Sequence, residues 1–155
     1  MAPADDAAAA VLDWPGGPAH PPTSKRSFLR KATPTEEAYE VLPLTGVEPT
    51  VTMGQLDALL THRSIDEVIH DPARKVIAMA SGGERFVVPL GGRFEEALLE
   101  LREDQLQEVA REWSQVEEFS GQGDATVLAD GIRSLATLVR TGLEHDHHLY
   151  CWVSV

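Results

Sequence analysis

The chain has 155 residues, of which 43% are hydrophobic and 25% are charged, and it carries a net charge of −12. This length and composition are typical of one soluble domain with its own hydrophobic core. Because nucleic acids and anionic membrane surfaces attract cationic proteins, the net charge argues against both as partners. The sequence shows neither a secretory signal nor an apolar run of the roughly 18 residues that a membrane span needs, so we expect a cytoplasmic protein.

The negative charge is unevenly distributed. Residues 1–35 hold four Lys and Arg side chains against three Asp side chains, whereas residues 95–118 carry nine carboxylates and two arginines. Such an acidic block can attract a basic protein partner, and it is equally typical of a surface that only keeps a protein soluble.

We interpret residues 1–34 as a short helix followed by a proline-rich arm. Two acids precede an alanine run, and acids at the start of a helix interact favourably with its dipole. Prolines and basic side chains follow, which favours an extended chain. The helix either docks on the core through Val11, Leu12 and Trp14 or is mobile with the arm. Residues 35–155 are then expected to form a single α+β domain.

Three Ser/Thr-x-x-Glu/Gln patterns mark candidate helix starts, because the hydroxyl and the later side chain can cap the first turn reciprocally. They begin at Thr33, Thr52 and Ser64. We expect the first to form at most one turn before an extended segment at residues 39–44. The second opens a helix, and the third opens a short helix that ends before Pro72.

Residues 75–80 and 85–89 predict a β-hairpin, because two central glycines supply the positive φ angles of a tight turn. Placing the turn on these glycines pairs Met79 with Phe86 and Ile77 with Val88, so that four large apolar side chains share one face.

Helical periodicity then runs from Phe94 to Phe119 and from Leu128 to Leu143, with Asp124 as the N-cap of the last helix. The final run is apolar on both faces and rich in β-formers, which predicts an interior strand. Helices and strands do not alternate regularly. We therefore predict an α+β fold with a small, mostly antiparallel sheet and helices packed on one side. The sheet comprises the hairpin at about residues 75–89 and the C-terminal strand 149–155.

A cluster of four residues is the first candidate site: His145, Asp146, His147 and His148. All four side-chain types can bind transition metals, but the cluster lacks the spacing of an established metal motif. A solvated turn and an acid–base or pH-sensing role are the alternatives.

Cys151 is the only cysteine, which excludes an intramolecular disulfide and a cysteine-based zinc site. Its neighbours Tyr150 and Trp152 place it in the most apolar run of the chain, so we expect a buried structural thiol and not a nucleophile.

The acidic block contains the second candidate site, a binding surface made by Glu108, Arg111, Glu112, Glu117 and Glu118. These side chains could dock a basic partner, with Arg111 as an anchor, or form a solvated helical face. The glycine pairs lack the spacing that cradles phosphates, and no pattern indicates a cofactor.

Four stretches together have a familiar combination of residues: 5–13 with 16–18, 54–61, 113–119 and 149–153. The set resembles a group of small acidic proteins encoded in high-GC actinobacterial genomes and is more distantly similar to the YfbM-like proteins. The resemblance covers most of the chain outside about residues 19–37. It brings no catalytic motif, so it implies no functional residue.

These observations support three hypotheses. The first is a non-enzymatic binding protein, for instance an inhibitor of the immunity or antitoxin type, that presents the acidic helical surface to a basic protein. The second is a metal-dependent enzyme that uses His145, His147 and an acid. The third is a structural, homodimerising domain; the sequence leaves both a monomer and a homodimer open.

Overall fold

The structure is a computed structural model that describes residues 1–14, 17–20, 39–44, 47–48 and 50–154. Its α-helices are α1 (Asp5–Ala10), α2 (Val51–Thr61), α3 (Ile65–Ile69), α4 (Gly92–Glu100), α5 (Glu103–Trp113) and α6 (Ala125–Leu143). Its strands are β1 (Ala78–Ala80), β2 (Arg85–Pro89) and β3 (Tyr150–Ser154). Its 3₁₀ turns are η1 (Val11–Asp13), η2 (Pro72–Arg74), η3 (Ser81–Gly83) and η4 (Glu117–Phe119). These elements confirm the predicted α+β class. Across the described ranges, no helix combines the length and the apolar character needed to cross a membrane.

The hairpin has the predicted register. β1 and β2 are antiparallel, and Met79 lies opposite Phe86. Gly82 and Gly83 have φ angles of 69° and 103°, a region that glycine enters without the steric cost of a side chain. Met79 is 61% exposed and lies on β1, a strand at the edge of the sheet.

The terminal strand lies at an edge of the sheet, so the prediction of an interior strand is wrong. The strand order is β1-β2-β3, and within the described residues β3 has a neighbouring strand on one side only. Val88 lies opposite Cys151, and Val87 lies opposite Trp152. The apolar faces of β3 reflect cover above and below the strand, which the sequence pattern does not distinguish from pairing at both edges.

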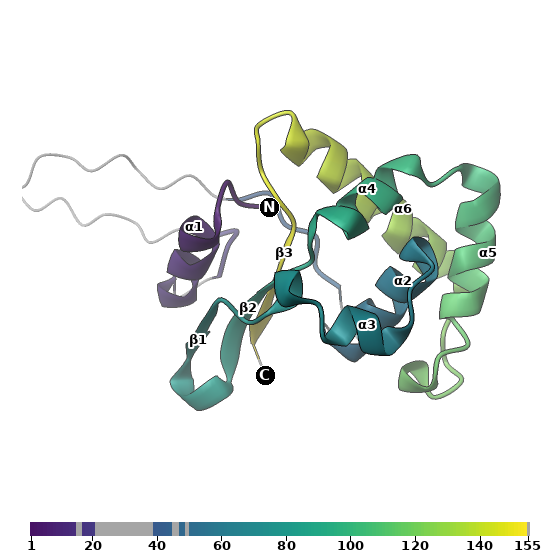
Figure 1. Cartoon of the computed structure of the whole chain (residues 1–155), viewed down its shortest axis with the longest axis horizontal. Coiled ribbons are helices and arrows are strands. Elements are labelled where there is room, and N and C mark those ends of the chain that lie inside the picture. Colours follow the sequence, from purple (N-terminus) through teal and green to yellow (C-terminus); the bar gives the residue numbers. More distant parts are fainter. Residues whose placement is uncertain (15–16, 21–38, 45–46, 49, 155) are drawn as a thin grey trace, which may run out of the picture.

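The two faces of β3 contribute to two hydrophobic clusters. Leu149 and Cys151 pack with the large helical cluster, whereas Tyr150 and Trp152 pack with α1 and η1. Figure 1 shows α2 to α6 gathered on one side of the sheet and α1 on the other. The larger helices therefore lie on one side, as predicted, and the short N-terminal helix adds a layer on the second face.

The N-terminal helix docks on the sheet, one of the two alternatives that the sequence left open. Val11, Leu12 and Trp14 are each at most 5% exposed. The Tyr150 hydroxyl donates a hydrogen bond to Oδ1 of Asp5 over 3.0 Å, which ties β3 to α1. Most of the expected proline-rich arm, and the expected helix start at residues 33–36, lie outside the described residues.

The main core lies between α2, α4, α5 and α6. Phe94, Trp113 and Ile132 are each at most 1% exposed, as their helical spacing predicts. The indole nitrogen of Trp113 donates to the carbonyl oxygen of Thr52 over 2.9 Å, so one buried aromatic side chain joins α5 to α2.

Two predicted helix caps are confirmed and one is wrong. Ser64 forms a reciprocal capping box at the start of α3, and the Asp124 carboxylate accepts backbone hydrogen bonds at the start of α6. The expected cap at Thr52 is buried inside α2, which begins at Val51. There the carboxylate of Glu48 accepts hydrogen bonds from the first backbone N–H groups instead.

The first two residues belong to the fold. Ala2 forms an antiparallel bridge with His148, immediately before β3. The side chain of Met1 lies directly on Gly142 of α6, where a Cβ atom would overlap the methionine sulfur. The sequence marks Gly142 only as a weak position in a helix, but the structure uses its missing side chain to admit a neighbour.

Candidate functional site

The predicted histidine cluster forms the turn between α6 and β3, and its side chains point to different partners. Nδ1 of His145 lies 3.1 Å from the carbonyl oxygen of Thr141, within the last turn of the helix. His147 packs edge-on against the ring of Tyr39, with ring centroids 6.4 Å apart. In the described part of the chain, no group of three or more His, Cys, Asp or Glu side chains is placed to hold a metal ion.

Two features make this turn a structural connection. Burial, followed by the nearby positive charges, lowers the pKa of His147, which favours its neutral form. Nδ1 of His148 lies 3.1 Å from Oε2 of Glu95, and the other oxygen of that carboxylate accepts the backbone N–H of Leu149. Glu95 is 3% exposed, so α4 holds the beginning of β3 through a buried carboxylate.

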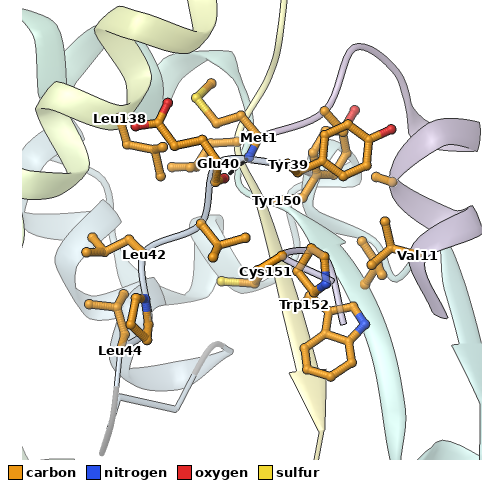
Figure 2. A pocket seen from close by; sticks show the side chains of 18 of the residues that line it. Met1, Val11, Tyr39, Glu40, Leu42, Leu44, Leu138, Tyr150, Cys151 and Trp152 are labelled. Carbon is orange, nitrogen blue, oxygen red and sulfur yellow. Dashed lines mark hydrogen bonds between the residues drawn. The ribbon is translucent and has the colours of Figure 1, made fainter. Parts of the chain in front are cut away.

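Cys151 points into a cavity on the helical side of β3 (Figure 2). Burial raises the pKa of its thiol to about 11, so the thiol is protonated at neutral pH. A protonated thiol is a poor nucleophile, which fits the structural role that the sequence suggests.

This cavity has a volume of about 500 Å³ and lies against the outer edge of β3. In Figure 2, Leu42, Leu44 and Leu138 lie on the same side of the strand as the thiol, while Val11 and Trp152 lie on the other side. No local sequence pattern predicts this cavity, because its wall combines an extended segment with residues from both ends of the chain.

The structure divides the predicted acidic surface into two parts. Glu108 and Glu112 lie one turn apart on α5 and line a groove. Arg111 is exposed beside them and forms a 3.5 Å ion pair with Glu108. Glu117 and Glu118 lie on η4, beyond the end of α5, and do not line the groove.

The groove runs between α2, α4 and α5 and has a volume of about 610 Å³. Its apolar wall comes from three helices and consists of Ala58, Leu59, Leu60, Ala97, Leu101 and Val109. Three carboxylates border this wall: Glu100, Glu108 and Glu112. Arg102 also lines the groove and is paired with Asp104.

Two leucines of this groove, Leu59 and Leu60, cannot be distinguished in the sequence from core residues, because they belong to the same apolar pattern. Leu59 and Leu60 are only partly buried, whereas Leu56 of the same helix is completely buried. In the sequence of α2, apolar residues cover more of the helix surface than the one face that packs on the core. This excess is the signal that could have identified the groove.

A buried ionic network connects α2, α3 and η2 and was also missed. Asp57 has no exposed surface and contacts Arg74 at 2.8 Å and Arg63 at 3.1 Å. Arg63 also pairs with Asp71 at 2.6 Å. All four charges are satisfied by one another, so this network holds the fold together and leaves no free acid or base for chemistry.

No family model, curated protein or solved structure matches this chain. The resemblance to small actinobacterial and YfbM-like proteins therefore stays a prediction.

Proposed function

We propose that this protein is a non-enzymatic binding protein that accepts a basic, amphipathic helix of a partner in the groove between α2, α4 and α5. The observation that carries the proposal is the apolar floor of this groove, bordered by Glu100, Glu108 and Glu112. An inhibitor of the immunity or antitoxin type that covers a basic region of its target is one form of such a protein.

Two properties of the groove support a helical partner. Amphipathic helices bind by laying their apolar face into a hydrophobic groove, and the floor here is built from leucine, alanine and valine side chains. Lysine or arginine side chains on the flanks of such a helix would face the carboxylates of the rim. Complementary charge of this kind increases the association rate and selects the partner.

The partner class can be tested with a defined probe, a fluorescein-labelled 14-residue helix of leucine and lysine with one apolar face. Fluorescence anisotropy measures its binding to the wild type and to Glu108→Lys/Glu112→Lys. We expect the double variant to bind about tenfold more weakly, a difference of about 1.4 kcal/mol.

The matched control is Glu117→Lys/Glu118→Lys, which changes the net charge by the same amount outside the groove. We expect less than about a threefold change for this control, because these exposed side chains do not line the groove and salt screens their charge at physiological ionic strength. Equal losses for both variants would mean that the probe responds only to net charge, and the groove proposal would then be wrong.

A further inference from the structure

The outer edge of β3 begins as a paired edge and then continues without a partner. The backbone N–H of Ala2 donates to the carbonyl oxygen of His148 over 3.0 Å, and the N–H of His148 donates back to Ala2 over 2.8 Å. This bridge is antiparallel. The position of a strand beside β3 is therefore already established two residues before β3 begins.

Alternation along the strand decides which backbone groups face this position. The N–H of Leu90, directly after β2, donates to the carbonyl oxygen of Leu149 over 3.0 Å, so Leu149 and every second residue after it face β2. The residues between them direct their N–H and C=O groups to the outer edge, as His148 does. Tyr150 and Trp152 thus present backbone groups that bond to no other strand in the described ranges.

The cavity of about 500 Å³ lies where a further strand would pair with these groups. It borders all five residues of β3 and reaches both faces of the strand. On one face it is lined by Met53, Leu135 and Leu138, and on the other by Ala8 and Val11. Its outer wall is the extended segment at residues 40–44 (Figure 2).

We propose that this cavity binds an extended, uncharged segment of a partner protein as a fourth strand, antiparallel to β3. A strand has N–H and C=O groups at the spacing needed to bond with the outward backbone groups of Tyr150 and Trp152. Its side chains alternate, so they would enter the two faces of the cavity in turn. Because the side chains of Met53, Leu135, Leu138, Ala8 and Val11 on the two faces are apolar, the segment is a short run of small or branched apolar residues. A charged residue facing these side chains would lose its hydration without gaining a partner from them.

The shape of the cavity favours a single strand over the edge of a second copy. The segment at residues 40–44 borders the outer side and limits the space beside β3. The β3 edge of another molecule would bring its own outer segment and its neighbouring strand β2 with it. This strand site is separate from the helix groove, because no residue lines both.

Hydrogen exchange measured by NMR, with and without a short test peptide, tests the proposal. The probe is acetyl-Lys-Val-Ala-Val-Ala-Val-Lys-amide, whose terminal lysines keep it soluble. We expect exchange of the Tyr150 and Trp152 amides to slow by about tenfold in the complex, because each gains a ladder hydrogen bond. The amides of Cys151 and Val153 already face β2 and should change by less than about twofold.

Two controls separate a strand from an apolar filler. The same peptide, N-methylated at its three central residues, keeps the side chains but loses ladder donors, and we expect it not to bind. Leu42→Trp fills the cavity and should abolish binding of the first peptide, whereas Leu99→Trp adds the same side chain at an exposed position of α4 and should not. Thermal melting checks that both variants are folded.

Four results would each overturn the proposal. A dissociation constant weaker than about 1 mM would show that the edge does not accept a strand. Equal binding of the methylated peptide would indicate an apolar cavity without ladder pairing. Protection of Tyr150 and Trp152 in the free protein would mean that the chain itself fills the position, and protection that rises with protein concentration would mean that a second copy does.

Discussion

Asp57 shows how one carboxylate can be accommodated in a hydrophobic core. It lies one residue after Leu56, at a position with no exposed surface, where two guanidinium groups reach it. Arg74 is itself 9% exposed and also lies near the carbonyl oxygen of Leu90, and this carboxylate is its counter-ion. A buried pair of this kind adds little stability relative to apolar residues, but the loss of one partner is costly.

Replacing Asp57 by asparagine keeps the shape of the side chain and removes its charge. We expect the free energy of unfolding to fall by about 3–5 kcal/mol, because Arg74 is then a buried cation without its counter-ion. Urea denaturation followed by circular dichroism measures the change. The double variant Asp57→Leu/Arg74→Leu should recover most of the loss; a double variant as unstable as the single one would show that the ionic contact itself supplies the stability.

At the scale of an element, α6 contains two glycines with opposite roles. A Cβ atom at Gly131 would meet no other atom within 4 Å, whereas one at Gly142 would overlap the side chain of Met1. Gly131 therefore only reduces the intrinsic stability of the helix. Gly142 creates the contact between α6 and the first residue, next to the bridge that leads into β3.

Alanine substitutions at these two positions should therefore change stability in opposite directions. Gly131→Ala is expected to raise the free energy of unfolding by about 0.5–1 kcal/mol through helix propensity. Gly142→Ala gains the same propensity but overpacks the contact with Met1, so we expect a net loss of about 1–3 kcal/mol. Thermal and urea denaturation of both variants give the comparison; stabilisation by Gly142→Ala would mean that Met1 moves aside at no cost.

At the scale of the whole molecule, two hydrophobic clusters meet at the sheet, and charged contacts connect the elements around them. The α2–α3–η2 region depends on the Arg63–Asp71 contact as well as on Asp57. The hydrogen bond from Arg63 lowers the pKa of Asp71 below its ordinary value. Such a group stabilises the folded state only while it is ionised.

This contact predicts a specific acid sensitivity. The stabilisation from Asp71 is fully present above the unfolded-state pKa of about 3.9 and is lost as the pH falls through the lower folded-state pKa. Below about pH 4, the free energy of unfolding should therefore fall less steeply for Asp71→Asn than for the wild type. Urea denaturation between pH 7 and pH 3 measures this, with Glu96→Gln on the exposed side of α4 as control; parallel curves for Asp71→Asn and the wild type would contradict it.

Local sequence patterns predicted most of the helices and strands. The features that they did not predict depend on contacts between distant segments. The periodic stripes of α4 to α6, the caps at Ser64 and Asp124 and the hairpin register all follow from interactions within a few residues. The edge position of β3, the cavity and the Asp57 network instead depend on which segments meet in space. Of the predicted acidic site, Glu108 and Glu112 line the groove, but its apolar floor comes from three different helices.

The position of β3 between the two clusters also has a consequence for folding kinetics. The bridge before it is to Ala2, its tyrosine bonds to Asp5, and its ladder is with β2, so each of these hydrogen-bonded contacts spans a long stretch of chain. Contacts of high sequence separation form slowly, because the intervening loop must first close. On the ribosome, the β2–β3 ladder and the bond between Tyr150 and Asp5 must therefore wait until residues 148–154 have been synthesised.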